Sequence, residues 1–142
     1  MRRRISAPKP RCAADDQEIR LTDNERIIRN FVAAWSRLDP DELVGYFAAD
    51  GVYHNMPARP VKGTENLRKF IAAFLANWDK TDWDILNLLA ADNIVMVERL
   101  DRTLAGGKPV NLPCVGIFEM RDGKIAVWRD YFDMATFTRA LQ

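Results

Sequence analysis

Apolar residues recur at helical spacing near the start of the chain. A spacing of three and four residues predicts a helix that runs to about residue 37, with one apolar stripe made of Ile27, Ile28, Phe31, Val32 and Trp35. Thr22 and Glu25 precede this stripe in the arrangement of a capping box, in which each side chain bonds a backbone N–H near the other residue. We therefore expect the helix to begin at Thr22.

Two more helices and one short strand are expected before residue 80. Asp39-Pro40 predicts the start of a short helix, because proline is favoured at the first helical position. Asp50-Gly51 predicts a turn into a strand over residues 52–56, and the two prolines after it predict an irregular loop. Thr64 is expected to cap a third helix that runs to about Trp78, with an inward face of Leu67, Phe70, Ile71 and Phe74.

From Trp83 onwards the pattern changes to the alternation that is typical of strands. Four strands are expected, over residues 83–90, 93–104, 109–120 and 124–132. Gly106-Gly107 and Asp122-Gly123 are hairpin signals, because tight hairpin turns need residues that accept a positive φ. Asp92-Asn93 breaks the pattern in a similar way, and a short helix is expected over about 134–141.

Helices followed by an antiparallel meander predict an α+β domain. We expect a curved mixed β-sheet that packs on three to four helices and forms a cone with an open mouth. A pocket would then lie between the sheet and the helices.

Five polar residues interrupt the apolar strands, and they are the candidate site. Residues two apart on a strand share a face, so Tyr53 goes with Asn55 and Arg99 goes with Asp101. Asp130 lies on an otherwise apolar face of the last strand. A charge on such a face costs several kcal/mol unless it is paired. Two aspartates and one arginine can neutralise one another in a pocket, and such a cluster is a candidate acid–base site.

Each of these residues also has a structural interpretation. Arg99 and Asp101 can form a cross-strand ion pair on a solvated face, and Asp130 can be a carboxylate that accepts backbone hydrogen bonds. His54 is the only histidine and faces away from its two neighbours, so we expect a surface or interface role for it. Asp133 is expected to cap the last helix rather than to take part in chemistry.

Composition and charge limit the possible functions. At 142 residues the chain is expected to form one domain, and a net charge of +1 gives no reason to expect a nucleic-acid partner. Residues 1–20 carry a net charge of +3, which leaves −2 on residues 21–142. We expect a disordered basic tail over 1–20 and a single catalytic domain over 21–142. No apolar run resembles a secretory signal or approaches the roughly 20 residues of a membrane span.

The two cysteines, Cys12 and Cys114, do not form a disulfide framework. A cytoplasmic enzyme with reduced thiols fits this usage best. Cys114 has no histidine near it in any motif, so we interpret it as a buried pocket thiol. The sequence contains no Ser-His-Asp pattern, no glycine-rich phosphate loop and no spaced His/Cys metal set, so no metal or other cofactor is expected.

Several motifs together resemble the limonene epoxide hydrolase family, from about Asn24 to Phe137. The most specific is Trp128-Arg129-Asp130-Tyr131-Phe132-Asp133, which follows Gly123-Lys124-Ile125. The other matching segments, in the same order, are Tyr53-His54-Asn55-Met56-Pro57, Glu98-Arg99-Leu100-Asp101, and Asn111-Leu112 with Gly116-Ile117-Phe118. The resemblance implies the cone-shaped α+β fold shared with ketosteroid isomerase and scytalone dehydratase, and it implies a homodimer.

The resemblance also implies an activity, the one-step addition of water to an epoxide to give a vicinal diol. By resemblance, Asp130 is the general base and holds the water together with Tyr53 and Asn55. Asp101 is the general acid that protonates the epoxide oxygen, and Arg99 bridges the two carboxylates. The expected partners are a small apolar cyclic epoxide, similar to limonene-1,2-epoxide, and water.

The expected pocket lining is Phe74, Trp78, Trp83, Leu112, Cys114, Phe132 and Phe137. Phe74, Trp78, Trp83 and the smaller Cys114 fall where the family often carries aliphatic residues, and the loop 105–108 looks short. These departures concern the substrate rather than the chemistry. Two other functions stay open: an isomerase or polyketide-cyclase-like enzyme of the same fold, and a non-catalytic small-molecule binding module.

Overall fold

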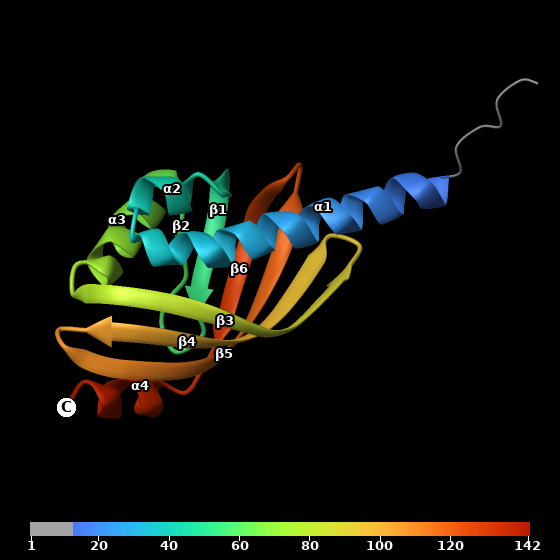
Figure 1. Cartoon of the computed structure of the whole chain (residues 1–142). Coiled ribbons are helices and arrows are strands. Elements are labelled where there is room, and N and C mark those ends of the chain that lie inside the picture. The colour runs from blue at the N-terminus through green and yellow to red at the C-terminus, as the bar shows by residue number, and fades with distance from the viewer. Residues whose placement is uncertain (1–12) are drawn as a thin grey trace, which may run out of the picture.

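The computed structural model describes the chain from Ala13 to Gln142, with side chains from Asp23 onwards. The helices are α1 (Ala13–Ala34), a 3-10 turn η1 (Trp35–Arg37), α2 (Pro40–Val44), α3 (Thr64–Leu75) and α4 (Met134–Ala140). The strands are β1 (Phe47–Asn55), β2 (Val61–Lys62), β3 (Trp78–Ala91), β4 (Ile94–Ala105), β5 (Lys108–Arg121) and β6 (Lys124–Tyr131). Figure 1 shows how these elements follow one another along the chain.

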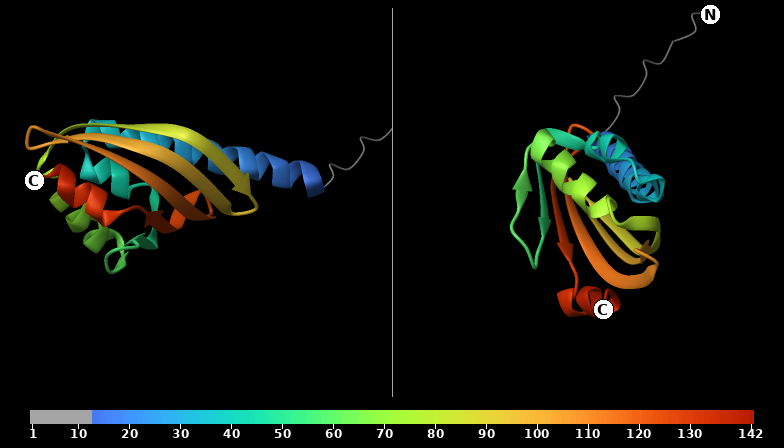
Figure 2. Two further views of the ribbon diagram at one scale, coloured as in Figure 1. Left: turned by 90° about the horizontal axis from the view of Figure 1, so that it is seen from below. Right: turned by 90° about the vertical axis from the view of Figure 1, so that its left-hand side faces the viewer.

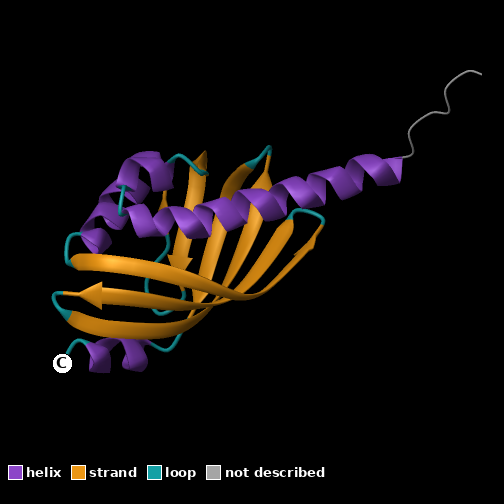
Figure 3. Cartoon of the chain, viewed as in Figure 1, coloured by secondary structure: helices purple, strands orange, loops and turns teal. Residues whose placement is uncertain are grey.

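All six strands form one curved sheet in the order β2-β1-β6-β5-β4-β3. The strands from β3 to β6 pair antiparallel with their neighbours, whereas β1 pairs parallel with β6, so the sheet is mixed. The sheet curls around α1, α2 and α3, and α4 lies beside the far end of β5 (Figures 1 and 2). Figure 3 shows the same layering by element type. The predicted cone-shaped α+β fold is therefore confirmed.

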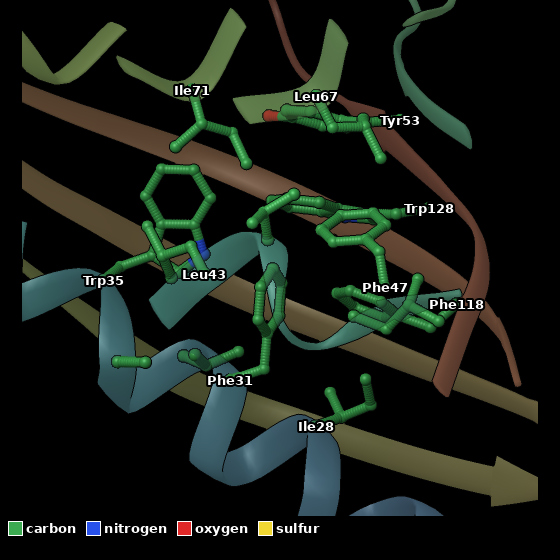
Figure 4. Packing of buried hydrophobic residues seen from close by; sticks show 14 of the residues in the cluster. Ile28, Phe31, Trp35, Leu43, Phe47, Tyr53, Leu67, Ile71, Phe118 and Trp128 are labelled. Atoms are coloured by element: carbon green, nitrogen blue, oxygen red, sulfur yellow. The ribbon is translucent and has the colours of Figure 1, made fainter. Parts of the chain in front are cut away.

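The main core lies between the helices and the concave face of the sheet, and aromatic rings dominate it. Phe31 of α1 makes edge contacts with Trp128 and Phe118 at centroid distances of 5.1 and 5.9 Å (Figure 4). Trp128 is fully buried and also stacks on Tyr53, with centroids 4.0 Å apart. Rings of this size bury large apolar areas, so the packing fixes the position of β6 relative to β1 and α1.

Local turn chemistry produces several of the predicted boundaries. Asp39 caps α2 by accepting hydrogen bonds from the backbone N–H groups of residues 41 and 42, and Asp133 caps α4 in the same way. Asp122 and Gly123 adopt φ of 51° and 74°, which gives the expected tight hairpin between β5 and β6. Gly106-Gly107 likewise joins β4 to β5.

The start of the first helix differs from the prediction. α1 begins at Ala13, so Thr22 lies inside the helix and is not its N-cap. The residues upstream include alanine, glutamine and glutamate, which are strong helix formers and can extend a helix beyond a capping pattern. Of the tail expected over 1–20, residues 1–12 lie outside the described residues and 13–20 belong to α1.

The segment around β1 and α3 also differs. β1 starts at Phe47, and Asp50-Gly51 forms an irregularity inside this strand instead of a turn before it. The expected loop contains the short strand β2, and α3 ends at Leu75, so Trp78 begins β3 instead of ending the helix. Gly63, with φ of 88°, is the N-cap of α3, while Thr64 is its first residue. Within residues 13–142, no helix has both the length and the apolarity needed to cross a bilayer.

Candidate active site

Sheet register brings the five polar residues to one region of the concave face. The parallel pairing of β1 with β6 aligns Asn55 with Asp130 and Tyr53 with Trp128. Arg99 and Asp101 lie on β4, with β5 between them and Asp130. All five polar residues are buried, which is unusual for charged groups and requires that they satisfy one another.

Arg99 forms hydrogen bonds with both aspartates. Its Nε and Nη2 atoms donate to the two carboxylate oxygens of Asp101 at 2.8 and 3.0 Å. Its Nη1 and Nη2 atoms donate to Asp130 at 2.9 and 2.5 Å. A planar guanidinium suits two such bidentate contacts, and they satisfy most of its donors. Asp130 also accepts a hydrogen bond of 2.8 Å from the indole nitrogen of Trp128.

Two tryptophan rings pack against the guanidinium group of Arg99. The Cζ atom of Arg99 lies 4.4 Å from the ring centroid of Trp83 and 5.5 Å from that of Trp128. Trp83 in turn stacks on Trp35 at 4.4 Å. Such cation–π contacts stabilise a desolvated cation by about 2 kcal/mol. They also leave Arg99 little freedom to change its orientation.

Gly116 of β5 makes room for this ion cluster. A Cβ atom at this position would lie 2.7 Å from Nη1 of Arg99 and 2.9 Å from Oδ1 of Asp130. A side chain on Gly116 would therefore fill the space in which Arg99 of β4 contacts Asp130 of β6. A glycine inside a strand often marks such a close approach, and this signal was present in the sequence although we did not use it.

An apolar cavity of about 260 Å³ opens in front of the two carboxylates. Its lining includes Tyr53, Asn55, Asp101 and Asp130, whereas Arg99 lies behind the carboxylates and does not reach it. Of the seven expected pocket residues, the cavity is lined by Phe74, Trp78, Leu112, Cys114, Phe132 and Phe137. The seventh, Trp83, does not line it. Sequence reasoning missed four further lining residues, Trp35, Ala58, Phe70 and Met134. It also missed Trp128 as a hydrogen-bond partner of Asp130.

The two carboxyl groups have different environments. Burial raises the pKa of Asp101 from 3.8 to about 6, and the charge of Asp130 adds to this, while Arg99 opposes it. Burial on its own would lower the pKa of Arg99, but the two carboxylates raise it well above its usual value, so the guanidinium stays charged. Asp101 can therefore hold a proton near neutral pH beside an arginine that carries its full charge.

Tyr53 and Asn55 are neutral polar groups beside Asp130. Burial, and then the nearby charge of Asp130, raise the pKa of Tyr53 well above 10, so its hydroxyl keeps its proton. The side-chain oxygen Oδ1 of Asn55 is buried and has no hydrogen-bond partner among the described residues. Such an atom costs free energy unless a water or a ligand satisfies it.

Cys114 is a buried thiol next to the carboxylates, as the sequence predicted. One ligand atom each from Cys114, Asp101 and Asp130 lies within 4.8 Å of the others, which is a possible metal-binding spacing. Arg99 already bonds both carboxylates and supplies the positive charge that a cation would bring. Burial, followed by the charge of Asp101, raises the pKa of the Cys114 thiol, which disfavours the thiolate that metals require. These residues therefore fit an arginine-bridged pair better than a metal site.

The remaining candidates of the sequence lie outside this cluster. His54 is half-buried, and its Nε2 atom lies 3.0 Å from the backbone oxygen of Ala58. Asp133 caps α4, as described above. Neither residue contacts the carboxylates.

Comparisons with known proteins identify the family. A SnoaL-like domain matches residues 28–128, which is most of the described chain. The chain belongs to the SnoaL-like domain family. It is 26% identical over 116 residues to the epoxide hydrolase EphG of Mycobacterium tuberculosis (strain ATCC 25618 / H37Rv), covering 80% of this chain and 76% of that protein.

Solved structures of this family agree with the fold. A limonene-epoxide-hydrolase-like (LEH-like) epoxide hydrolase from M. tuberculosis superposes with a TM-score of 0.76 at 26% identity, covering 86% of this chain and 91% of that one. The epoxide hydrolase/cyclase-like enzyme SalBIII, described in pyran ring formation in the polyether salinomycin, gives a TM-score of 0.73 at 15% identity, covering 81% of this chain and 94% of that one. The second likeness concerns the fold alone. The resemblance to limonene epoxide hydrolases is thus confirmed.

Proposed function

We propose that this SnoaL-like protein is an epoxide hydrolase that adds water to a small apolar cyclic epoxide and releases a vicinal diol. The observation that carries this proposal is the arginine-bridged pair of buried aspartates at the wall of an apolar cavity. One of the two carboxyls, Asp101, has a pKa raised to about 6. An acid and a base that face the same small cavity can act on one substrate at the same time.

In the proposed mechanism, Asp130 takes a proton from a water molecule that Tyr53 and Asn55 hold. The water oxygen forms a bond to one epoxide carbon while the bond from that carbon to the epoxide oxygen breaks. Asp101 gives its proton to the leaving oxygen. The diol therefore gains a hydroxyl group from water and a proton from Asp101, while Asp130 ends with the other proton of the water. Transfer of that proton from Asp130 to Asp101 after the reaction restores the starting state, so the net change is the addition of one water.

The unsatisfied oxygen of Asn55 supports this assignment of the water. A water that donates one hydrogen bond to Oδ1 of Asn55 and one to Asp130 would be oriented for attack by its lone pair. Tyr53 keeps its proton and can donate a hydrogen bond to the same water. The resulting cluster needs no metal for this reaction, because Arg99 carries the positive charge that stabilises Asp130 as a carboxylate.

A cyclase-like or isomerase activity is the alternative, because the same pair of carboxyl groups can also transfer protons in such a reaction. Such an enzyme would use one carboxylate for proton transfer and would direct a hydroxyl of the substrate, rather than water, to the reacting carbon. The bridged pair of aspartates fits both reactions. The nucleophile is therefore the feature that separates them.

The test is a single turnover in ¹⁸O-labelled water with a panel of cyclic and linear epoxides. We expect vicinal diols that carry one labelled oxygen, and no diol with Asp130→Asn. Ring-closed products without label would favour the cyclase. Unlabelled diol in the first turnover would indicate that an aspartate attacks the substrate, and absence of reaction with every epoxide would refute the proposed function.

A further inference from the structure

Five aromatic side chains form a continuous wall on the helix side of the cavity. We call Tyr53, Phe70, Phe74, Trp78 and Trp35 the aromatic wall; all five line the cavity. They come from four different elements, namely β1, α3, the start of β3 and the turn η1. Their convergence is a property of the fold and not of one amphipathic helix.

The rings of the aromatic wall contact one another in sequence. Tyr53 meets Phe70 edge to face, with centroids 5.6 Å apart, and Phe70 meets Phe74 in the same way at 4.8 Å. Phe74 is followed by Trp78 at 6.1 Å, and Trp78 by Trp35 at 6.1 Å. Because each ring supports the next, the wall is pre-organised and cannot collapse into the cavity.

Three of these rings keep accessible surface in spite of their inward position. Phe70, Phe74 and Trp78 are only partly buried although they pack against the core. Trp128 and Phe118, by contrast, are fully buried. All three rings line the cavity, so a ligand bound there would contact them.

Strands β4, β5 and β6 contribute the reacting groups and the smaller side chains of the cavity, namely Asp101, Asp130, Leu112 and Cys114. Tyr53 joins the aromatic wall to these groups, because β1 pairs with β6. A substrate whose epoxide contacts the two carboxylates must present the rest of its surface to the aromatic wall. A planar aromatic ring offers such a wall edge-to-face and stacked contacts, which a saturated ring with its axial hydrogens cannot make.

We propose that the site takes epoxides that bear an aromatic ring on, or fused next to, the epoxide carbon. This inference rests on the proposed function for the position of the epoxide, but the aromatic wall itself does not depend on it. The cavity of about 260 Å³ lies just below the range typical of drug-sized ligands, so the substrate has one or two rings.

Binding of two product diols tests the inference without reference to turnover. Phenyl-1,2-ethanediol and cyclohexyl-1,2-ethanediol share one carbon skeleton and differ only in the aromaticity of the ring. Burial of apolar area alone favours the larger saturated ring, whereas the aromatic wall favours the phenyl compound. We expect calorimetry to give a Kd for the phenyl diol about three- to tenfold lower than that for the cyclohexyl diol. Equal affinities, or a tighter cyclohexyl diol, would overturn the inference.

Substitutions in the wall should remove this preference. Phe74→Leu and Trp78→Leu keep an apolar surface, so each should weaken phenyl diol binding severalfold and leave cyclohexyl diol binding within twofold. Tyr46→Leu is the matched control, because Tyr46 is a half-buried aromatic residue that contacts Phe31 and does not line the cavity, so the change should leave both constants unchanged. If Trp78→Leu fails to fold, Phe74→Leu still tests the inference, because Phe74 is only partly buried. An unchanged ratio in the folded variants would refute the role of the wall.

The same compounds separate this inference from the proposed function. If the enzyme converts both phenyl oxirane and cyclohexyl oxirane to diols, and binds the two diols with similar affinity, the hydrolase function is supported and the aromatic preference is refuted. If the protein binds the phenyl diol selectively but converts neither epoxide, the aromatic preference is supported and the hydrolase function is refuted.

Discussion

Arg99 combines full burial with a complete set of partners. Removing a guanidinium from water costs several kcal/mol, and its two carboxylate contacts and two ring contacts offset this cost. The same contacts hold Asp101 and Asp130 at one wall of the cavity. The two aspartates therefore form a single unit whose acid and base depend on each other through one shared arginine.

Asparagine at either aspartate should abolish most activity. Asp101→Asn and Asp130→Asn keep the shape of the side chain and remove proton transfer, so each should lower kcat on the order of 100-fold or more. Because both groups act on one transition state, the double variant should lose much less than the product of the two single losses. Steady-state diol formation measures all three. Wild-type rates in both single variants would show that other groups carry the chemistry.

The raised pKa of Asp101 predicts an effect of pH on stability and an effect of pH on activity. Folding raises this pKa from 3.8 to about 6, so between these values the folded state binds more protons than the unfolded state. The contribution of Asp101 to the free energy of unfolding is thus greatest below pH 4 and falls as the pH rises to 6. Activity should likewise fall above about pH 6, where the acid loses its proton.

The measurement is the difference between wild type and Asp101→Asn in urea unfolding at several pH values. Arg68 and Arg121 lower the pKa values of Asp41 and Asp50, so the stability contributions of these two carboxylates change with pH in the opposite direction. Both contributions are present in wild type and variant, and they cancel in the difference. We expect the free energy of unfolding of the wild type to decrease relative to that of Asp101→Asn as the pH rises from 4 to 6. A difference that is constant with pH would show that folding does not raise the pKa of Asp101.

Strand β5 determines how closely the side chains of β4 and β6 can approach one another. Its Gly116 pairs with Asp130 on one side and with Val97 on the other, so it lies directly between the two carboxylate-bearing strands. The close approach of Arg99 to this glycine makes the backbone of β5 one wall of the ion cluster. The geometry of the acid–base pair therefore depends on a residue that has no side chain.

Gly116→Ala should damage the site more than the fold. The added methyl group would overlap Arg99 and Asp130, so the ion pair must shift or lengthen. We expect a loss in kcat of at least tenfold, together with a decrease in the free energy of unfolding of about 1–3 kcal/mol. Gly107→Ala, in the exposed hairpin before β5, is a control for the loss of a glycine, and it should lower stability without lowering kcat of the folded enzyme. A Gly116→Ala enzyme with normal kcat would mean that the strands can separate freely.

Local elements could be predicted from the sequence where local chemistry determines them. The hairpins at 106–107 and 122–123 and the cap at Asp133 depend on neighbouring residues only, and they were predicted. The parallel pairing of β1 with β6 joins segments that lie far apart along the chain, and no local pattern reports it. The pairing of Arg99 with Asp101 was visible as a two-residue spacing. Its contact with Asp130 was expected only from the cost of leaving a buried charge unpaired, and the bridging role of Arg99 came from the family resemblance.

The cavity lining shows a similar division. Alternation predicts which side chains point inward, but it cannot separate a residue that packs against the core from one that faces open space. Trp83 and Trp78 both point inward on β3, yet Trp83 lies against Arg99 and Trp35 while Trp78 lines the cavity. That difference depends on the three-dimensional path of α1 and η1.

The outer face of the sheet bears on how the whole molecule is assembled. Leu89 and Met96 pair across β3 and β4, Met96 pairs with Ile117 of β5, and Leu89 is 73% exposed. Val115 and Tyr131 pair across β5 and β6 on the same face and are also exposed. Helices α1, α2 and α3 cover the other face of the sheet (Figure 2). A row of apolar side chains that no element within residues 13–142 covers favours association with another surface.

We predict that this face joins two copies of the chain in a homodimer, in agreement with the family resemblance. The double variant Leu89→Glu with Met96→Glu would bring like charges together at a two-fold interface, so sedimentation should detect monomers at concentrations where the wild type is dimeric. Ala73→Glu, which adds a charge to an exposed position on α3, should stay dimeric. The melting temperature of the wild type should also rise with protein concentration, because dissociation accompanies unfolding of a dimer. A wild-type protein that sediments as a monomer, with a melting temperature independent of concentration, would contradict this assembly.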